Sequence, residues 1–255
     1  MNPLLRRVRT AIGDAYGRFW ASETLVMLTM ATAVGLGGGF SAVGFRWLIE
    51  TAHSFFFGTL GSWLRFMGRY HVVVLPGLGG LIVGLLIHFV SAESKGPGVA
   101  SVMEAMALRG GRIRPIVVAA KPLATSITIG SGGSGGREGP IVQIGSAIGS
   151  ALSQLARLSE DRTKNLVAAG AAAGIAATFN APLAGVMFAL EVLLAQFELM
   201  QFTSVVVSAV IASLVGHAYF GDVPAFAFPQ SSSFDAWEVP VYGLLGVVAA
   251  FMGVG

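Results

Sequence analysis

The sequence contains no cysteine and few charged residues, and both absences narrow the kinds of protein that it can encode. Without cysteine there is no disulfide framework and no thiolate metal site. Charged residues make up 11% of the chain and apolar residues 54%, whereas a soluble domain carries roughly 25% charged residues. The mean hydropathy is +0.74. These values predict an integral membrane protein that lies in a lipid bilayer.

Two further shortages exclude other classes of function. The four histidines show no spacing typical of a metal site, and no cofactor motif stands out, so we expect neither a metal nor a cofactor. The net charge of +3 is too small to indicate a nucleic-acid partner. No enzyme activity is expected.

Lysine and arginine are also absent from residues 165–255, since all sixteen lie at or before Lys164. Cytoplasmic loops of membrane proteins carry an excess of these residues. The rule places the N-terminus and the loops 109–114 and 157–164 in the cytoplasm, and it places the loop 221–236 outside. The cell (inner) membrane is the expected location.

The apolar segments predict an all-α fold with several broken helices. Residues 1–20 are expected to form a basic amphipathic helix at the membrane surface. Asn180 is expected to cap the helix that Pro182 begins. Glycines at 35–39 predict close helix packing in the first span. The expected apolar segments are 24–57, 72–90, a short one ending near 108, 115–129, 141–155, 165–179, 183–194, 202–220 and 237–255. Such interrupted segments are typical of transporters.

One motif dominates the sequence, the run Gly130-Ser-Gly-Gly-Ser-Gly-Gly-Arg137-Glu138-Gly139-Pro140. Glycines allow a sharp turn and close approach of the backbone, and Pro140 suits the first turn of a helix. The free N–H groups of a helix N-terminus attract an anion. Glu138 is itself an anion at this end, which predicts a gate that competes with the bound ion. A structural ion pair with Arg137 is the alternative, and it is disfavoured because adjacent helical residues do not face each other.

Two enzyme-like patterns overlap this motif. Gly130, Gly132 and Gly135 match the dinucleotide-binding spacing, but no acidic residue follows at the expected distance of about 20 residues. Ser134 sits in a glycine-rich turn like that of intramembrane serine proteases, with His217 in a later segment. A serine protease that uses Ser134 and His217 is therefore the alternative function.

Three stretches resemble the CLC family of chloride channels and proton-coupled chloride transporters. Gly136-Arg-Glu-Gly-Pro140 is similar to one conserved motif, and Gly96-Pro-Gly-Val-Ala100 is similar to another. The block from Ala168 to Glu191 resembles a third. The resemblance implies the first half of an inverted-repeat fold over residues 21–220, with the start of the second repeat at 237–255. A partial sequence is therefore expected.

The resemblance implies a role for each matching residue. Glu138 would be the gating glutamate, and Glu138 and Glu191 would carry protons. Gly136, Arg137 and Gly139 would bind the anion at the outer site, and Gly96, Pro97 and Gly98 would bind it at the inner and central sites. The substrate would be chloride or another monovalent anion such as nitrate, moved by a proton-coupled exchanger or a voltage-gated type of channel. The protein would be a homodimer whose interface includes helices within 183–220.

Three positions depart from the family pattern. Pro97 replaces a pore serine and so lacks both a hydroxyl and an N–H group. Proline at this place is seen in nitrate-preferring plant members, which makes nitrate a candidate substrate, and a variant without effect on selectivity is the alternative. Ala100 and Ser101 replace Pro-Glu. The internal proton glutamate falls at Val192, one residue after Glu191, and valine cannot carry a proton. Either Glu191 takes its place, or the coupling is altered, or the protein is a passive channel.

Overall fold

The computed structural model describes residues 23–90, 96–195, 198–221 and 237–254, and in these ranges it contains helices and no strand. The predicted amphipathic helix 1–20 lies outside the described residues, and so does nearly all of the loop 221–236. Three described segments are long and apolar enough to cross a membrane, namely Glu23–Trp63, Val72–Val90 and Gln201–Phe220. The all-α prediction is confirmed for the described residues.

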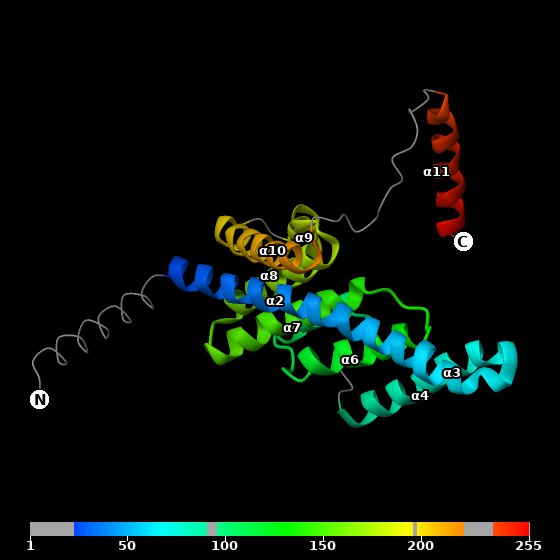
Figure 1. The fold of residues 1–255 in the computed structure, drawn as a ribbon. Coiled ribbons are helices and arrows are strands. Elements are labelled where there is room, and N and C mark those ends of the chain that lie inside the picture. Colours follow the sequence, from blue (N-terminus) through cyan, green and yellow to red (C-terminus); the bar gives the residue numbers. More distant parts are fainter. Residues whose placement is uncertain (1–22, 91–95, 196–197, 222–236, 255) are drawn as a thin grey trace, which may run out of the picture. The chain divides into compact units, whose positions relative to one another are not determined.

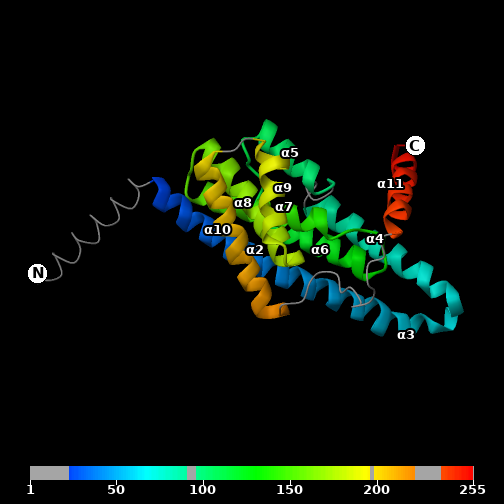
Figure 2. The same cartoon turned by 90° about the horizontal axis from the view of Figure 1, so that it is seen from above.

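Helix α2 (Glu23–His53) is the long element against which much of the first unit packs. It continues through the π-helical turns of η1 (Ser54–Leu60) into α3 (Gly61–Trp63). Its first part lies beside α10 and α8, and its later part lies beside α6 (Figures 1 and 2). A Cβ on Gly35 would lie 2.7 Å from the carbonyl oxygen of Ser208. The predicted close packing at 35–39 is thus confirmed.

The next four helices carry the two glycine-rich loops. After η2 (Leu64–Tyr70), α4 (His71–Val90) forms the second predicted span. The short α5 (Val99–Leu108) and α6 (Val117–Gly130) follow, and then α7 (Glu138–Leu155). Because α7 begins at Glu138, Pro140 is its third residue, and the acidic side chain lies in the first helical turn, where the helix dipole favours it.

Helices α7 and α8 (Glu160–Phe179) pack backbone against backbone at the centre of the unit. A Cβ on Gly145 would meet the carbonyl group of Gly170, and a Cβ on Gly149 would meet that of Leu166. Ser146 Oγ donates to the carbonyl of Val167 at 3.1 Å. These contacts fix α7, and with it Glu138, against the most buried helix of the fold.

The predicted start of α8 is wrong, whereas its predicted end at 179 is right. The helix begins at Glu160 and not at 165, so the second half of the predicted loop 157–164 is helical. Lys164 lies 2.7 Å from Glu160 one turn earlier, and this hydrogen bond lowers the pKa of the exposed Glu160 carboxyl. Arg162 pairs with Glu23 at 2.7 Å, which joins the starts of α8 and α2. The pair Glu160–Lys164 within the helix and the pair Arg162–Glu23 between helices therefore stabilise helical structure in a stretch whose polar composition suggested a loop.

Asn180 ends α8 and does not cap the following helix. Its backbone is left-handed (φ 53°, ψ 40°), a conformation that asparagine tolerates better than most residues. Ala181 is the N-cap of α9 (Pro182–Phe188), whose first residue is the predicted Pro182. Helix α9 runs on into the π-helical η4 (Ala189–Leu194), and α10 (Leu199–Phe220) follows.

Helix α11 (Glu238–Val254) belongs to a second compact unit, residues 226–255. The first unit, residues 1–225, holds both glycine-rich loops and is the part that bears on the site.

Candidate functional site

The loop before α5 makes a tight turn around Pro97. The N–H of Gly98 donates to the carbonyl of Gly96 at 2.9 Å, which closes a three-residue turn. Gly98 then caps α5 with φ 55° and ψ −90°, a backbone conformation open to glycine and strained for other residues. The carbonyl of Gly98 accepts the N–H of Val102 at 3.2 Å and starts the helix. The N-terminus of α5 is therefore set by glycine at position 98.

The second loop leads from α6 to the N-terminus of α7. Gly132 adopts φ 94°, and the N–H of Gly133 donates to the carbonyl of Thr128 at 2.9 Å. The first bond within α7 runs from the N–H of Ile141 to the carbonyl of Arg137 at 3.1 Å. Pro140 has no N–H group, and the N–H groups of Glu138 and Gly139 have no partner inside the helix, as at any helix start.

The two loops touch through glycine backbone. A Cβ on Gly98 would meet the carbonyl group of Gly139 and lie 2.6 Å from its Cα, and a Cβ on Gly139 would lie 3.7 Å from Gly98 Cα. No residue with a side chain fits between them at position 98. The N-termini of α5 and α7, residues 41 positions apart at Gly98 and Gly139, are thus brought to one place, where their dipoles both favour an anion.

Glu138 and Arg137 turn to different neighbours at this junction. The carboxylate of Glu138 folds back over Gly136, where a Cβ would lie 3.2 Å from Glu138 Cδ. The guanidinium of Arg137 lies over the ring of Phe179, 5.5 Å from its centroid. Among the described residues the two side chains form no ion pair, so the exposed Glu138 carboxylate is not tied to its neighbour.

Lys121 contacts the loop before α5, a role that was not predicted from the sequence. Its side chain on α6 is buried, with 6% of the residue exposed, and Nζ donates to the carbonyl of Gly96 at 2.8 Å. This bond ties the loop before α5 to α6 and places an amino group beside Gly96. The available signal was that Lys121 is the only charge in an apolar helix, since such residues are functional by default.

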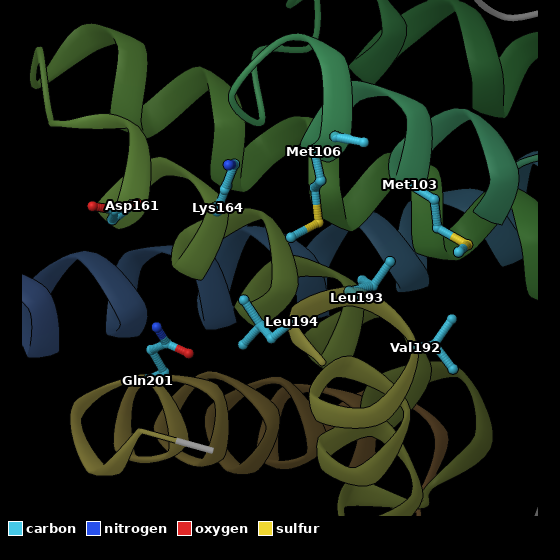
Figure 3. A pocket seen from close by; sticks show the side chains of 9 residues that line it. Met103, Met106, Asp161, Lys164, Val192, Leu193, Leu194 and Gln201 are labelled. Carbon is cyan, nitrogen blue, oxygen red and sulfur yellow. The ribbon is translucent and has the colours of Figure 1, made fainter. Parts of the chain in front are cut away.

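Two cavities lie at α5. The first, of about 330 Å³, is lined by Gly96, Ser101, Gln143, Arg109 and neighbours. The second, of about 430 Å³, lies between α5, α8, η4 and α10. Figure 3 shows Asp161, Lys164 and Gln201 at one end of the second cavity and Met103 and Val192 at the other.

The remaining predicted residues lie apart from this junction. Glu191 is exposed on η4 and lines neither cavity, whereas the adjacent Val192 lines the second one. His217 on α10 bonds through Nε2 to Asn180 Oδ1. Ser134 is exposed in the turn before α7. No group of three or more metal-binding side chains occurs within the part of the chain that the structure describes.

Comparison with known proteins identifies relatives of this arrangement. A family model described as voltage gated chloride channel matches residues 79–255. The H(+)/Cl(-) exchange transporter ClcA of Vibrio parahaemolyticus is 34% identical over 256 residues, which cover 94% of this chain and 53% of that protein. The chain therefore spans about half the length of this curated relative.

Solved structures share the fold. A slow cyanobacterial Cl-/H+ antiporter matches 89% of this chain and 54% of its own, with a TM-score of 0.73 and 23% identity. A CLC-type fluoride/proton antiporter matches 91% and 56%, with a TM-score of 0.67 and 24% identity. These likenesses confirm the predicted fold, and the comparisons give no support to the protease alternative.

Proposed function

The chain belongs to the voltage-gated chloride channel (CLC) family, and from this premise we propose that it forms half of a pathway that exchanges small monovalent anions for protons. The observation that carries the proposal is the contact between Gly98 and Gly139, which joins two helix N-termini at one point. Chloride is the first candidate substrate, because the similar Vibrio parahaemolyticus protein and the similar cyanobacterial structure are both named as exchangers of chloride and protons. Nitrate is the second candidate, because Pro97 offers neither an N–H nor a hydroxyl group at the turn, and a compact ion such as chloride loses more from this than nitrate does.

In this proposal the backbone at Gly136, Arg137 and Gly139 binds the anion on the outer side. The turn Gly96, Pro97 and Gly98 binds it further in. The anion gains from the unpaired N–H groups and the dipoles of α5 and α7, and the amino group of Lys121 lies beside Gly96.

Glu138 is the proposed gate. Its carboxylate is the anion that stands at the α7 N-terminus when no substrate is there, and protonation removes its competing charge. The absence of an ion pair to Arg137 among the described residues leaves Glu138 available to move. Glu191 is the proposed inner carboxylate of the proton route, although its side chain lies apart from the junction.

The assembly and topology follow the same proposal. Residues 21–220 form the first repeat, 221–236 an extracytoplasmic loop, 237–255 the start of the second repeat, and 1–20 a cytoplasmic amphipathic helix. Two copies associate through helices within 183–220, where large apolar side chains such as Leu183, Leu199 and Leu214 are exposed. The N-terminus is cytoplasmic and the cell (inner) membrane is the location.

The test is anion and proton flux in liposomes that contain the full-length protein. Glu138→Gln removes the titratable charge at constant size. We expect anion flux to continue and coupled proton movement to disappear. The assignment of the gate is refuted if a chloride gradient still drives proton movement through the Glu138→Gln protein as it does through the unmutated protein. The matched control is Glu50→Gln, which replaces an exposed carboxylate on α2 that pairs with Arg46. It should leave the coupling unchanged.

A further inference from the structure

Pro97 leaves the turn before α5 short of hydrogen-bond donors. Proline has no N–H group and no side-chain donor, and the carbonyl of Gly96 is occupied by Lys121 and by the N–H of Gly98. An anion that loses part of its water at this turn needs donors to replace that water. The next residue along the chain with a hydroxyl is Ser101.

Ser101 lies directly against the turn. It is the third residue of α5, and a Cβ on Gly96 would meet its Oγ and lie 3.2 Å from its Cβ. Gly96 and Ser101 also line the same cavity of about 330 Å³. The hydroxyl of Ser101, in the first turn of α5, therefore reaches the space next to Gly96.

The Ser101 hydroxyl is not used by the helix. Many helical hydroxyls of this protein donate to a carbonyl three or four residues earlier, as Thr29, Ser126 and Thr128 do at 2.9–3.0 Å. Within residues 96–195 and the other described ranges, no hydrogen bond of the Ser101 hydroxyl is found. Its proton is thus available to a ligand in the cavity.

The rest of the cavity suits a small anion that keeps part of its water. One water occupies about 30 Å³ of liquid, so a cavity of about 330 Å³ holds an ion with several waters. The amide of Gln143 and the guanidinium of Arg109 are further donor groups on its wall. Glu104 is the carboxylate on the wall, and Arg109 lies 3.6 Å from it, which offsets its charge.

We infer that this cavity receives the transported anion next to Gly96 and that Ser101 is a specificity-determining residue, whose hydroxyl contacts the ion in place of a donor at position 97. The inference rests on the proposed function. A compact ion such as chloride gains more from one hydroxyl than nitrate does, because nitrate spreads its charge over three oxygens. Ser101 therefore counteracts the preference for nitrate that Pro97 creates.

The test measures chloride and nitrate flux and binding in the full-length protein. Ser101→Ala should weaken chloride binding about tenfold, the effect of losing one hydrogen bond to a charged group. Nitrate binding should weaken less, so the nitrate-to-chloride ratio should rise. Ser101→Thr keeps the hydroxyl and should keep the ratio. Ser41→Ala is the matched control, since that helical hydroxyl already donates to Gly38 at 2.8 Å.

A double variant separates the hydroxyl from packing. Pro97→Ser in the Ser101→Ala background restores a donor at the turn and should return the ratio toward that of the unmutated protein. Equal losses in Ser101→Thr and Ser101→Ala, or an unchanged ratio in Ser101→Ala with normal flux, would overturn the inference and leave the proposed function standing. An unmutated protein that moves neither anion would overturn both.

Discussion

Gly98→Ala is the substitution that acts most directly on the junction of α5 and α7. The added methyl group would lie 2.6 Å from Gly139 Cα, about 0.8 Å inside the 3.4 Å at which ordinary contact begins. The neighbour is backbone, so no side chain can turn aside. The loop and the start of α7 must separate.

The cost has two sources. A non-glycine residue held at φ 55° and ψ −90°, outside the regions that side chains normally adopt, costs roughly 1–3 kcal/mol. Forcing a methyl group into a packed contact costs typically about 1–3 kcal/mol. If the chain separates the two N-termini to relieve the strain, an anion loses the donors of one of them, and each hydrogen bond to a charged group is worth about 1.5–3 kcal/mol. Chloride binding should therefore weaken by at least about tenfold, which corresponds to ~1.4 kcal/mol.

The assay is chloride binding by titration calorimetry, together with thermal unfolding in detergent. Gly44→Ala is the matched control, because a Cβ at this glycine in α2 would have no neighbour within 4 Å. The control should bind chloride normally. Chloride affinity in Gly98→Ala within twofold of the unmutated protein would refute the claim that this contact builds the site.

Two further predictions concern selectivity and coupling. Pro97→Ser adds a hydroxyl and an N–H group at the turn, so the anion preference measured by liposome flux should shift toward chloride by about tenfold or less. Identical nitrate-to-chloride ratios in the two proteins would show that position 97 does not set selectivity. Glu191→Gln removes the one carboxylate beside Val192, so proton-coupled flux should stop while anion movement continues, and coupling that survives would point to another proton route.

The local features of the fold could be predicted from the sequence because they depend on neighbouring residues. The apolar runs indicated the helices, and the glycines with Pro140 indicated a turn at a helix start. The start of α8 and the cap of α9 were nevertheless predicted incorrectly. Glu160 and Lys164 extend α8 by one turn, and Asn180 ends a helix because it adopts a left-handed backbone.

The site itself depends on contacts between distant residues, which no local pattern reveals. Glycines at 98 and 139 each suited a turn, but only the packing shows that the absence of a side chain at 98 lets the two turns meet. The Lys121 bond to Gly96 joins residues 25 apart. The spacing of these residues carries no periodicity, so their meeting is set by how α6, α7 and α8 pack.

If the N-termini of α5 and α7 together bind an anion, bromide can locate that anion directly. Crystals of the full-length protein grown in bromide would be measured at the bromine absorption edge. We predict an anomalous peak within hydrogen-bond distance of backbone N–H groups at the start of α7, beside the Gly98–Gly139 contact, and a weaker peak there in Gly98→Ala. Bromide peaks elsewhere in the membrane part, with none beside this contact, would contradict it.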